Sequence, residues 1–412
     1  MKRRVVITGM GVISPIGNNA AETWAAVQAG TCGIDEITAF EPEGYKVKFA
    51  GEVKNLDIET YFTKREMKFN ARFVQFARIA AKQAWEDAGL KKEAIDPERF
   101  GVIIGSGIGG LKNVEEADHA LCDRGPGRVS PFFIPMAIIN LAAGNVAIDL
   151  DARGICTSTV TACAAASSAL GEAFHRIRDG YEELILAGGS EAAITPLGVA
   201  GFQSMRALYT GDDKTRASIP FDKDRSGFVM GEGAGLLMLE ELSHAQKRGA
   251  KIYGEIVGYG TSCDAHHITA PLEDGRGAAQ AMRLALADGG LQPEDIDYIN
   301  AHGTSTPLND KGETAAVKQV FGSHCEKLMI SSTKSMTGHL LGASGGVEAA
   351  VTVKALEEGF VPATIGYQNF DPECDLNVVP NIGVRKEIRY ALSNSFGFGG
   401  HNVSLAFAGW EE

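Results

Sequence analysis

Short apolar runs that end in glycine alternate with amphipathic stretches along most of the chain. The β-branched run at residues 5–8 and the apolar run at 100–104 predict strands buried on both faces. The pattern at residues 19–30 predicts a helix, and residues 64–90 carry the longest amphipathic pattern. Further strands are expected at 184–187 and 235–240. Such alternation predicts an α/β fold with mostly parallel sheets.

The same alternation restarts in the second part of the chain. The charged helical stretch at residues 241–249 predicts a joint between two halves, 1–250 and 251–412. Residues 329–348 repeat the order strand, turn, reactive side chain and small-residue helix that is found at 158–170, which suggests an internal duplication. The other elements expected in the second half are strands at 251–257 and 298–301 and helices at 278–287 and 314–320.

Composition and charge narrow the class of protein. The 412 residues include 22% charged and 44% hydrophobic ones, and the formal net charge is -13. This charge argues against broad nucleic-acid binding or an anionic membrane surface, and an acidic partner would need a local basic patch. Neither a signal peptide nor an apolar run of membrane-spanning length is recognisable.

Cysteine usage indicates a reducing compartment. The seven cysteines are scattered, and no Cys-x-x-Cys pair occurs. Neither a disulfide framework nor a structural zinc site is therefore expected, and a cytoplasmic location is the simplest interpretation.

Cys163 stands between a β-branched strand end and a run of small residues that favours helix. A thiol at the start of a helix lies beside free N–H groups and the positive end of the helix dipole, which favours a thiolate. The alternative is a small buried cysteine, the commonest role of an intracellular Cys.

Residues 105–110 match the dinucleotide-binding pattern G-x-G-x-x-G after a predicted strand. The acidic residue expected about 20 positions later is missing. Close packing of the backbone therefore explains these glycines better than nucleotide binding does.

Two histidines and a glycine-rich loop also follow predicted strands or turns. His302 lies in a hydroxyl-rich loop, His339 stands at a predicted helix start, and residues 394–402 carry glycines that allow close approach to a ligand. A lone histidine is usually structural, but sites in α/β folds form where strands end. Two neutral imidazoles donating to one thioester carbonyl can stabilise the enolate left by departing carbon dioxide, without a metal or organic cofactor.

Four motifs together resemble the Cys-His-His condensing enzymes, the β-ketoacyl synthases. They are residues 161–163 (Thr-Ala-Cys), 301–307 (Ala-His-Gly-Thr-Ser-Thr-Pro), 332–339 (Ser-Thr-Lys-Ser-Met-Thr-Gly-His) and 394–400 (Asn-Ser-Phe-Gly-Phe-Gly-Gly). The similarity covers essentially the whole chain and is strongest to the bacterial synthase II group of fatty acid synthesis. It implies a thiolase-like fold of two related halves in a five-layered α-β-α-β-α arrangement, usually a homodimer.

The resemblance also implies a division of labour within the site. Cys163 would accept the acyl chain from acyl carrier protein, and His302 and His339 would assist decarboxylation of malonyl-carrier protein. The N–H groups of Cys163 and Phe398 would form the oxyanion hole, and Phe398 would gate the acyl pocket.

Supporting roles follow from the same resemblance. Lys334 would organise the histidines electrostatically together with Glu348. The remaining implied contacts are Thr304 and Thr306 with the phosphopantetheine arm, Ile108 and Phe202 with the acyl tunnel, and Arg65, Lys68 and Arg206 with the acidic carrier protein. The alternative for each of these basic residues is a solvent-exposed side chain with no role in docking.

Several related functions compete with this interpretation. Thiolases use a second cysteine in the C-terminal glycine-rich loop, which has none here, and initiating synthases carry Asn in place of His339. A chain-length partner subunit would lack Cys163, whereas a polyketide synthase subunit shares every motif and stays open. A non-catalytic scaffold would leave Cys163 inert.

The chain departs from the usual family pattern at several positions, which are the alanines after Cys163, Phe69, Asn309 and His401. These departures are expected to bear on pocket length and carrier affinity.

Overall fold

Ten strands form one continuous sheet in the computed structural model, which describes residues 2–411. The sheet runs in the order β10-β9-β13-β14-β8-β1-β7-β6-β4-β5. Its strands are β1 (Val5–Ile13), β4 (Phe100–Gly105), β5 (Cys156–Thr157), β6 (Leu184–Glu191), β7 (Gly233–Glu241), β8 (Gly254–Cys263), β9 (Tyr298–Asn300), β10 (Met329–Ser331), β13 (Tyr390–Gly397) and β14 (His401–Gly409). Two small ladders pair β2 (Asp35–Glu36) with β3 (Phe49–Ala50) and β11 (Phe360–Val361) with β12 (Val384–Arg385).

The sheet consists of two halves with the same topology. In each half the strands lie in the order third, second, fourth, fifth, first, counted along the chain. In both halves the third strand pairs parallel with the second, and the second pairs parallel with the fourth. The fifth strand pairs antiparallel with both the fourth and the first. Residues 5–7 of β1 join the halves by pairing with residues 254–256 of β8. This repeated topology agrees with the duplication suggested by the sequence.

The expectation of mostly parallel sheets is wrong. Among residues 2–411, five of the nine pairings in the large sheet are antiparallel and four are parallel. The reason is that the fifth strand of each half, β7 or β14, inserts antiparallel between its first and fourth strands. A run of apolar residues shows that a strand is buried but not which way its neighbours run.

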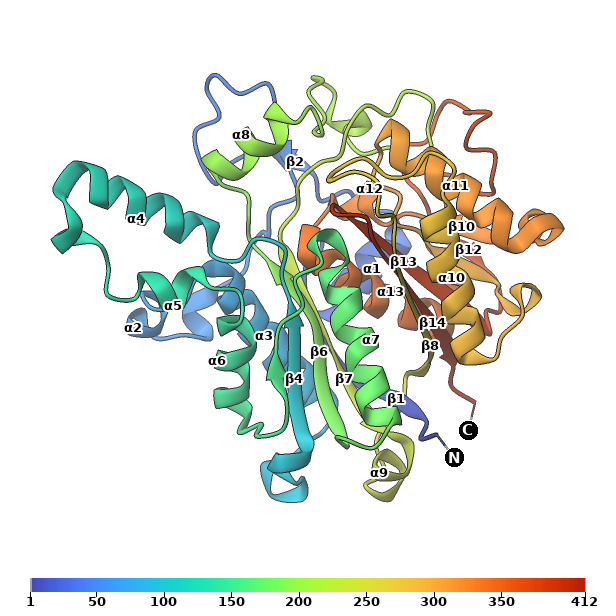
Figure 1. Ribbon diagram of the computed structural model, residues 1–412, viewed down its shortest axis with the longest axis horizontal. Coiled ribbons are helices and arrows are strands. Elements are labelled where there is room, and N and C mark those ends of the chain that lie inside the picture. Colours follow the sequence, from blue (N-terminus) through green and yellow to red (C-terminus); the bar gives the residue numbers. More distant parts are fainter. Residues whose placement is uncertain (1, 412) are drawn as a thin grey trace.

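Helices cover and separate the two halves in five layers (Figure 1). α3 and α6 pack on the outer face of the first half, α10 and α11 pack on that of the second, and α7 and α13 lie between them. The five-layered arrangement is thus confirmed. The helices are α1 (Ala20–Ala29), α2 (Lys64–Met67), α3 (Arg72–Asp87), α4 (Leu111–Arg124), α5 (Phe133–Ala137), α6 (Leu141–Leu150), α7 (Ala165–Arg178), α8 (Pro196–Ser204), α9 (Leu242–Lys247), α10 (Arg276–Gly289), α11 (Pro307–Phe321), α12 (Lys334–Thr337) and α13 (Ser344–Glu358).

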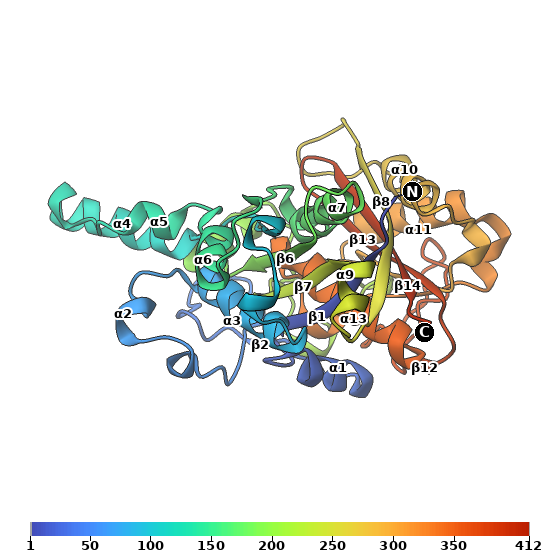
Figure 2. The same cartoon turned by 90° about the horizontal axis from the view of Figure 1, so that it is seen from below.

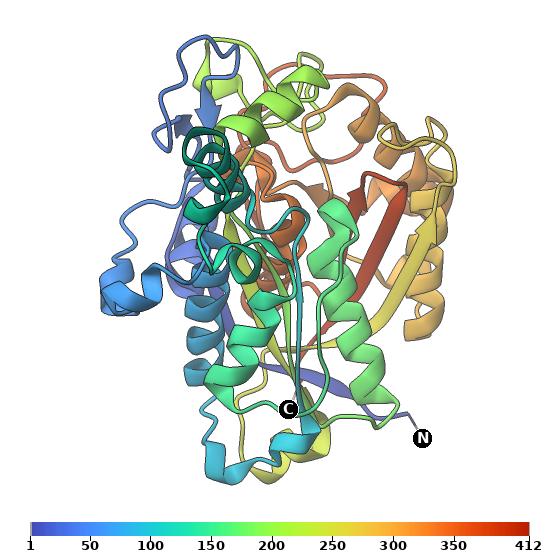
Figure 3. The same ribbon diagram turned by 60° about the vertical axis from the view of Figure 1, so that its left-hand side comes forward.

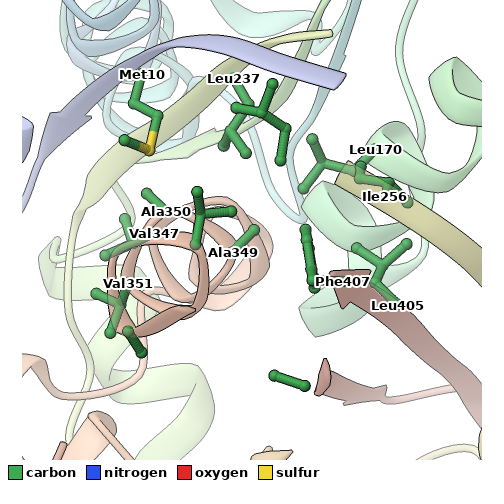
Figure 4. Close-up of a cluster of buried hydrophobic side chains, with 14 of the residues drawn as sticks. Met10, Leu170, Leu237, Ile256, Val347, Ala349, Ala350, Val351, Leu405 and Phe407 are labelled. Atoms are coloured by element: carbon green, nitrogen blue, oxygen red, sulfur yellow. The ribbon is translucent and has the colours of Figure 1, made fainter. Parts of the chain in front are cut away.

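The central helix α13 is buried from both sides. Val347, Ala349, Ala350 and Val351 of α13 face apolar side chains from both halves of the sheet and from α7, including Leu237 and Phe407 (Figure 4). Small side chains let α13 approach the strands closely, and a Cβ added at Gly235 would lie 2.2 Å from the Val347 nitrogen. The start of α13 is thereby fixed between the sheet halves.

The amphipathic stretch at residues 64–90 forms two helices instead of one. α2 ends where the buried Asn70 side chain donates a hydrogen bond to the Glu66 carbonyl at 2.8 Å. The side chain of Gln75 donates in turn to the Asn70 carbonyl, so the chain turns before α3 begins.

The helix predicted at residues 19–30 is confirmed as α1, with Asn19 as its N-cap and Gly30 at φ 66° after its last turn.

Residues 111–150 form an arm of helices that the sequence pattern did not predict. α4 and α5 project from the body of the molecule (Figures 1 and 2). In α4 only Ala120 is buried among the described residues, so most of this helix lies outside the hydrophobic core. The two chain ends lie at the opposite end of the molecule from α8 (Figures 1 and 3). Within residues 2–411 no helix combines the length and apolarity needed to cross a membrane.

Candidate active site

Cys163 lies in a tight turn that leads into α7. A 3-10 turn at Ala162–Ala164 precedes the helix, and Ala162 has a positive φ of 50°, a strained conformation for a residue with a side chain. Neighbouring loops approach this turn through glycines. A Cβ added at Gly105 would lie 2.5 Å from the Ala165 backbone, and one at Gly397 would lie 2.7 Å from the Thr161 carbonyl. Close backbone packing therefore accounts for the start of the G-x-G-x-x-G stretch, as expected.

The Cys163 thiol is protonated in the resting site. Burial raises the pKa of Cys163 to about 12, and the nearby Glu191 carboxylate raises this pKa further. The Lys334 ammonium and the backbone N–H groups of Phe398 and Cys163 lower the pKa, but they do not offset burial. The thiolate expected from the helix start is therefore not favoured in the resting site, because burial raises the pKa of Cys163 more than Lys334 and the two N–H groups lower it.

His302 follows β9 in a loop that is held by carboxylates of α11. Glu313 accepts hydrogen bonds from the N–H groups of His302 and Gly303 at 2.9 and 2.8 Å. Asp310 accepts from the N–H of Thr304 at 3.0 Å. Burial raises the pKa of Glu313 to about 7. Sequence reasoning missed both supports; the only signal was a pair of acidic side chains three residues apart on a mostly uncharged helix.

His339 lies between α12 and a second 3-10 turn, Leu341–Ala343. Its ring nitrogen Nδ1 is 2.9 Å from the Ser344 hydroxyl, which leaves Nε2 for a substrate. The rings of His302 and His339 have their centroids 5.2 Å apart and are nearly perpendicular. The aromatic rings of Phe396 and Phe228 pack against His302 and His339, respectively.

Both imidazoles are neutral near neutral pH. Burial lowers the pKa of His302 and of His339 well below its usual value, and the Lys334 ammonium lowers both further. Lys334 is itself fully buried and forms an ion pair with Glu348 of α13. The sequence-based pairing of Lys334 with Glu348 is therefore present in the structure. One buried cation thus lies close enough to influence the thiol and both histidines.

The two halves supply equivalent turns. The turn at Leu341–Ala343 leads into α13 as the turn at Ala162–Ala164 leads into α7, and Leu341 has a positive φ of 49° like Ala162. The residue that corresponds to Cys163 is therefore Gly342, three positions after His339. The sequence correctly suggested two related turns but placed the second reactive side chain at the wrong position in them.

A cavity of about 410 Å³ brings most of the predicted residues together. The predicted residues that line it are Cys163, Phe202, Arg206, His302, Thr304, Thr306, His339 and Phe398. Ile108 packs in the apolar cluster that contains Cys163 and Phe202. Lys334 and Glu348 stand behind the histidines, outside the lining. Arg65 and Lys68 belong to the α2 segment on the surface and do not line this cavity.

The details of the lining fit a long ligand with an apolar end. The rings of Phe202 and Phe398 have centroids 6.4 Å apart, and the hydroxyls of Thr304 and Thr306 are 2.9 Å apart. Within the described residues, no group of three or more His, Cys, Asp or Glu side chains is arranged to hold a metal ion. The arrangement offers one thiol, two neutral imidazoles and two N–H groups that approach the sulfur.

Comparisons with known proteins agree with this geometry. Residues 2–245 match the family model described as "Beta-ketoacyl synthase, N-terminal domain", and residues 253–368 match "Beta-ketoacyl synthase, C-terminal domain". The chain is 55% identical over 407 residues to a 3-oxoacyl-[acyl-carrier-protein] synthase 2 of Synechocystis, covering 98% of each chain. It is 51% identical over 409 residues to the protein of that name from Staphylococcus aureus, covering 99% of each.

A solved structure is also similar over the full length. It is a type II polyketide ketosynthase in complex with its acyl-carrier protein and bound to a hexaketide, with 35% identity, a TM-score of 0.92 and coverage of 100% of each chain. The fold of this chain is therefore similar to that of a polyketide ketosynthase as well.

Proposed function

The chain belongs to the β-ketoacyl synthase family, and on that premise we propose that it is an elongating synthase of type II fatty acid synthesis. It joins malonyl-acyl carrier protein to an acyl group held on Cys163 and releases 3-oxoacyl-carrier protein and carbon dioxide. The observation that carries the proposal is the single cavity lined by Cys163, His302 and His339. The identity of 51–55% to two curated 3-oxoacyl-[acyl-carrier-protein] synthases supports the substrate class.

In the first step the acyl chain moves from the carrier protein to the enzyme. The Cys163 sulfur attacks the thioester carbonyl, and the N–H groups of Cys163 and Phe398 stabilise the negative oxygen that forms. The bond to the phosphopantetheine sulfur then breaks, and that sulfur takes the proton that the thiol loses. Because the resting thiol is protonated, it reacts as this proton is transferred.

In the second step the malonyl group loses carbon dioxide. Nε2 of His339 and a ring nitrogen of His302 donate hydrogen bonds to the malonyl thioester oxygen. As the bond to the carboxylate breaks, its electron pair forms an enolate, and the two N–H donors stabilise the charge. A neutral imidazole can donate in this way at neutral pH without being consumed as an acid. We propose that no metal or organic cofactor takes part.

In the third step the enolate carbon attacks the acyl thioester on Cys163. The new carbon–carbon bond forms, the bond between the carbonyl carbon and the Cys163 sulfur breaks, and the sulfur takes up a proton from solvent. Phe398 then acts as the gate of the acyl pocket, whose tunnel is lined by Ile108 and Phe202. Thr304 and Thr306 hold the phosphopantetheine arm in the outer part of the cavity.

The assembly and its location are part of the proposal. β5 is a sheet edge whose two residues are exposed, and the exposed apolar residue Val160 follows it three positions later; Ile134 and Ile138, at α5, are exposed as well. An uncovered strand edge beside apolar side chains favours pairing with a second copy, so we propose a homodimer. Residues 1–250 form the half with the nucleophile and 251–412 the half with the histidines. The free cysteines in the described residues support a reducing, cytoplasmic compartment.

The function is tested with purified protein and carrier-bound substrates. Acyl-carrier proteins with acyl chains of graded length are mixed with malonyl-carrier protein, and the products are identified by mass spectrometry. Formation of 3-oxoacyl-carrier protein extended by one two-carbon unit supports the proposal. Repeated condensation to poly-3-oxo chains would assign the enzyme to polyketide synthesis, and no condensation with any chain would refute the synthase function.

Arg206 is expected to guide the acidic carrier protein to the cavity. It is exposed at the cavity lining and has a positive φ of 56°. Arg206→Glu should lower kcat/KM for acyl-carrier protein several-fold at low ionic strength and less at high salt, because charge complementarity mainly speeds encounter. Arg385→Glu, with the same charge change on β12, is the control. An equal loss of kcat/KM in both variants, or no loss in Arg206→Glu, would show that Arg206 is not part of the docking surface.

A further inference from the structure

Glu191 is a buried carboxylate that takes no part in the steps above. It is the last residue of β6 and has no exposed surface. Its two oxygens accept five hydrogen bonds, from the Ser106 hydroxyl at 2.9 Å and from four backbone N–H groups. The N–H donors and distances are Gly107 at 2.6 Å, Ile108 at 3.2 Å, Gly109 at 3.2 Å and Gly342 at 3.1 Å.

All five partners of Glu191 donate, and all five are neutral. A protonated carboxyl group would turn its O–H toward these donors, so the cradle favours the ionised form although burial raises the pKa of Glu191. The glycine-rich loop at residues 105–110 thus binds an anion, but the anion is a side chain of the protein. No room for a further side chain remains around the carboxylate. A Cβ added at Gly107 would lie 2.9 Å from Oε2 of Glu191, and one added at Gly342 would lie 2.7 Å from it.

Three turns of the cavity wall lie around this carboxylate, and the first and third of them donate hydrogen bonds to it. The first carries Ile108, which packs in the apolar cluster with Cys163. The second is the thiol turn itself, since the Cβ position of Gly107 is 3.6 Å from the Ala162 carbonyl. The third is the turn at Leu341–Ala343, two residues after His339. Glu191 therefore connects the half of the fold that holds the thiol with the half that holds the histidines.

We propose that Glu191 is a positioning residue of the condensation site, which holds the Ile108 loop and the turn after His339 against the thiol turn and opposes negative charge on the Cys163 sulfur. The inference rests on the proposed function of the cavity. Ala162 and Leu341 are both held at positive φ, and strained turns persist only where surrounding contacts fix them. The hydrogen bond from Gly342 to Glu191 supplies such a contact beside Leu341, and the Gly107 loop that Glu191 holds packs against the Ala162 carbonyl.

The negative charge of Glu191 has a separate consequence for the thiol. It is one of the groups that raise the pKa of Cys163, and it has no partner cation among its hydrogen-bond donors. This charge adds to burial, which is the main cause of the raised pKa of the Cys163 thiol. Such a thiol is less exposed to adventitious alkylation or oxidation between turnovers, because the thiolate is the reactive form.

The Glu191→Gln variant distinguishes the positioning of the turns and the effect of the charge on the thiol from a general loss of folding stability. The variant has nearly the same shape but lacks the charge, and its amide NH2 group faces N–H donors. Alkylation of Cys163 by iodoacetamide is followed from pH 6 to 10 by peptide mass spectrometry. The rate in Glu191→Gln should begin to rise at lower pH than in wild type, with a roughly tenfold faster reaction at pH 8 for each unit by which the thiol pKa falls.

Acyl transfer is measured in the same variant with acyl-carrier proteins of graded length. Displacement of the Ile108 loop should lower kcat/KM at least tenfold and change the preference among chain lengths. Glu191→Asp keeps the charge but shortens the reach, so it should lose transfer activity while keeping the wild-type alkylation profile. A lower melting temperature with unchanged alkylation and chain-length profiles in Glu191→Gln would overturn the proposal.

Ser106→Ala covers the case in which Glu191→Gln does not fold. It removes one donor while the four backbone donors and the charge remain. We expect transfer to fall at least threefold with the alkylation profile unchanged, and wild-type transfer in this variant would contradict the positioning role. Failure of the wild-type protein to condense any substrate would instead refute the proposed function.

Discussion

Cys163→Gln is expected to abolish formation of 3-oxoacyl-carrier protein while malonyl-carrier protein is still decarboxylated. Glutamine cannot accept the acyl group, so condensation should fall by about four orders of magnitude or more. His302 and His339 are held by Glu313, Ser344 and the backbone and do not depend on the thiol. Carbon dioxide release and 3-oxoacyl product are measured separately with labelled malonyl-carrier protein.

Cys122→Gln is the matched control, because this cysteine is exposed on α4 and lies outside the cavity. It should keep both activities. Residual condensation at more than about one thousandth of the wild-type rate in Cys163→Gln would mean that another group carries the acyl chain. Loss of both activities in a folded Cys163→Gln protein would show that the thiol and the histidines do not have separate tasks.

Lys334→Met is expected to be the most destabilising single change in the site. It leaves Glu348 buried without its partner cation, which typically costs about 3–5 kcal/mol of unfolding free energy. The double variant Lys334→Met/Glu348→Gln removes both charges and should recover most of that loss. Urea unfolding of the wild type, Lys334→Met, Glu348→Gln and the double variant measures the coupling free energy between Lys334 and Glu348. Equal destabilisation in the single and double variants would show that the ion pair is not the cause.

The double variant also has a predicted pH dependence. In wild type the pKa values of both histidines lie well below 6.5, so decarboxylation should show no loss as the pH falls through 6.5. The Lys334 cation opposes protonation of the imidazoles, so its removal raises both pKa values. The acid limb of the decarboxylation profile should therefore move to higher pH. An acid limb at the wild-type pH would contradict electrostatic control of the histidines by Lys334.

The residues that meet in the cavity could be predicted because most of them follow a strand or begin a helix. Cys163, His302 and Phe398 occupy such positions, whereas His339 lies between α12 and the turn at Leu341–Ala343. All four meet in one cavity. Close packing was also predicted for the glycines at residues 105–110, and the structure confirms it at Gly105, whereas Gly397 was expected to approach a ligand and packs on the backbone at Thr161 and Cys163.

The supports behind these residues could not be predicted from the sequence. Glu191 binds the N–H of Gly342, 151 positions away, and such a contact leaves no local pattern. The pKa of Cys163 depends on burial that only the complete fold determines. The direction of β7 and β14 is likewise set by pairing with distant strands. The break between α2 and α3 depends on Asn70, whose capping hydrogen bond interrupts an otherwise continuous amphipathic pattern.

In the proposed reaction Cys163 carries the acyl chain while the histidines activate malonyl-carrier protein. The direct measurement is peptide mass spectrometry of the protein after incubation with one acyl-carrier protein, before and after addition of malonyl-carrier protein. We expect one acyl group on Cys163 that disappears as an equal amount of 3-oxoacyl-carrier protein forms. An unmodified Cys163, or an acyl group that stays when malonyl-carrier protein is added, would contradict the proposed reaction.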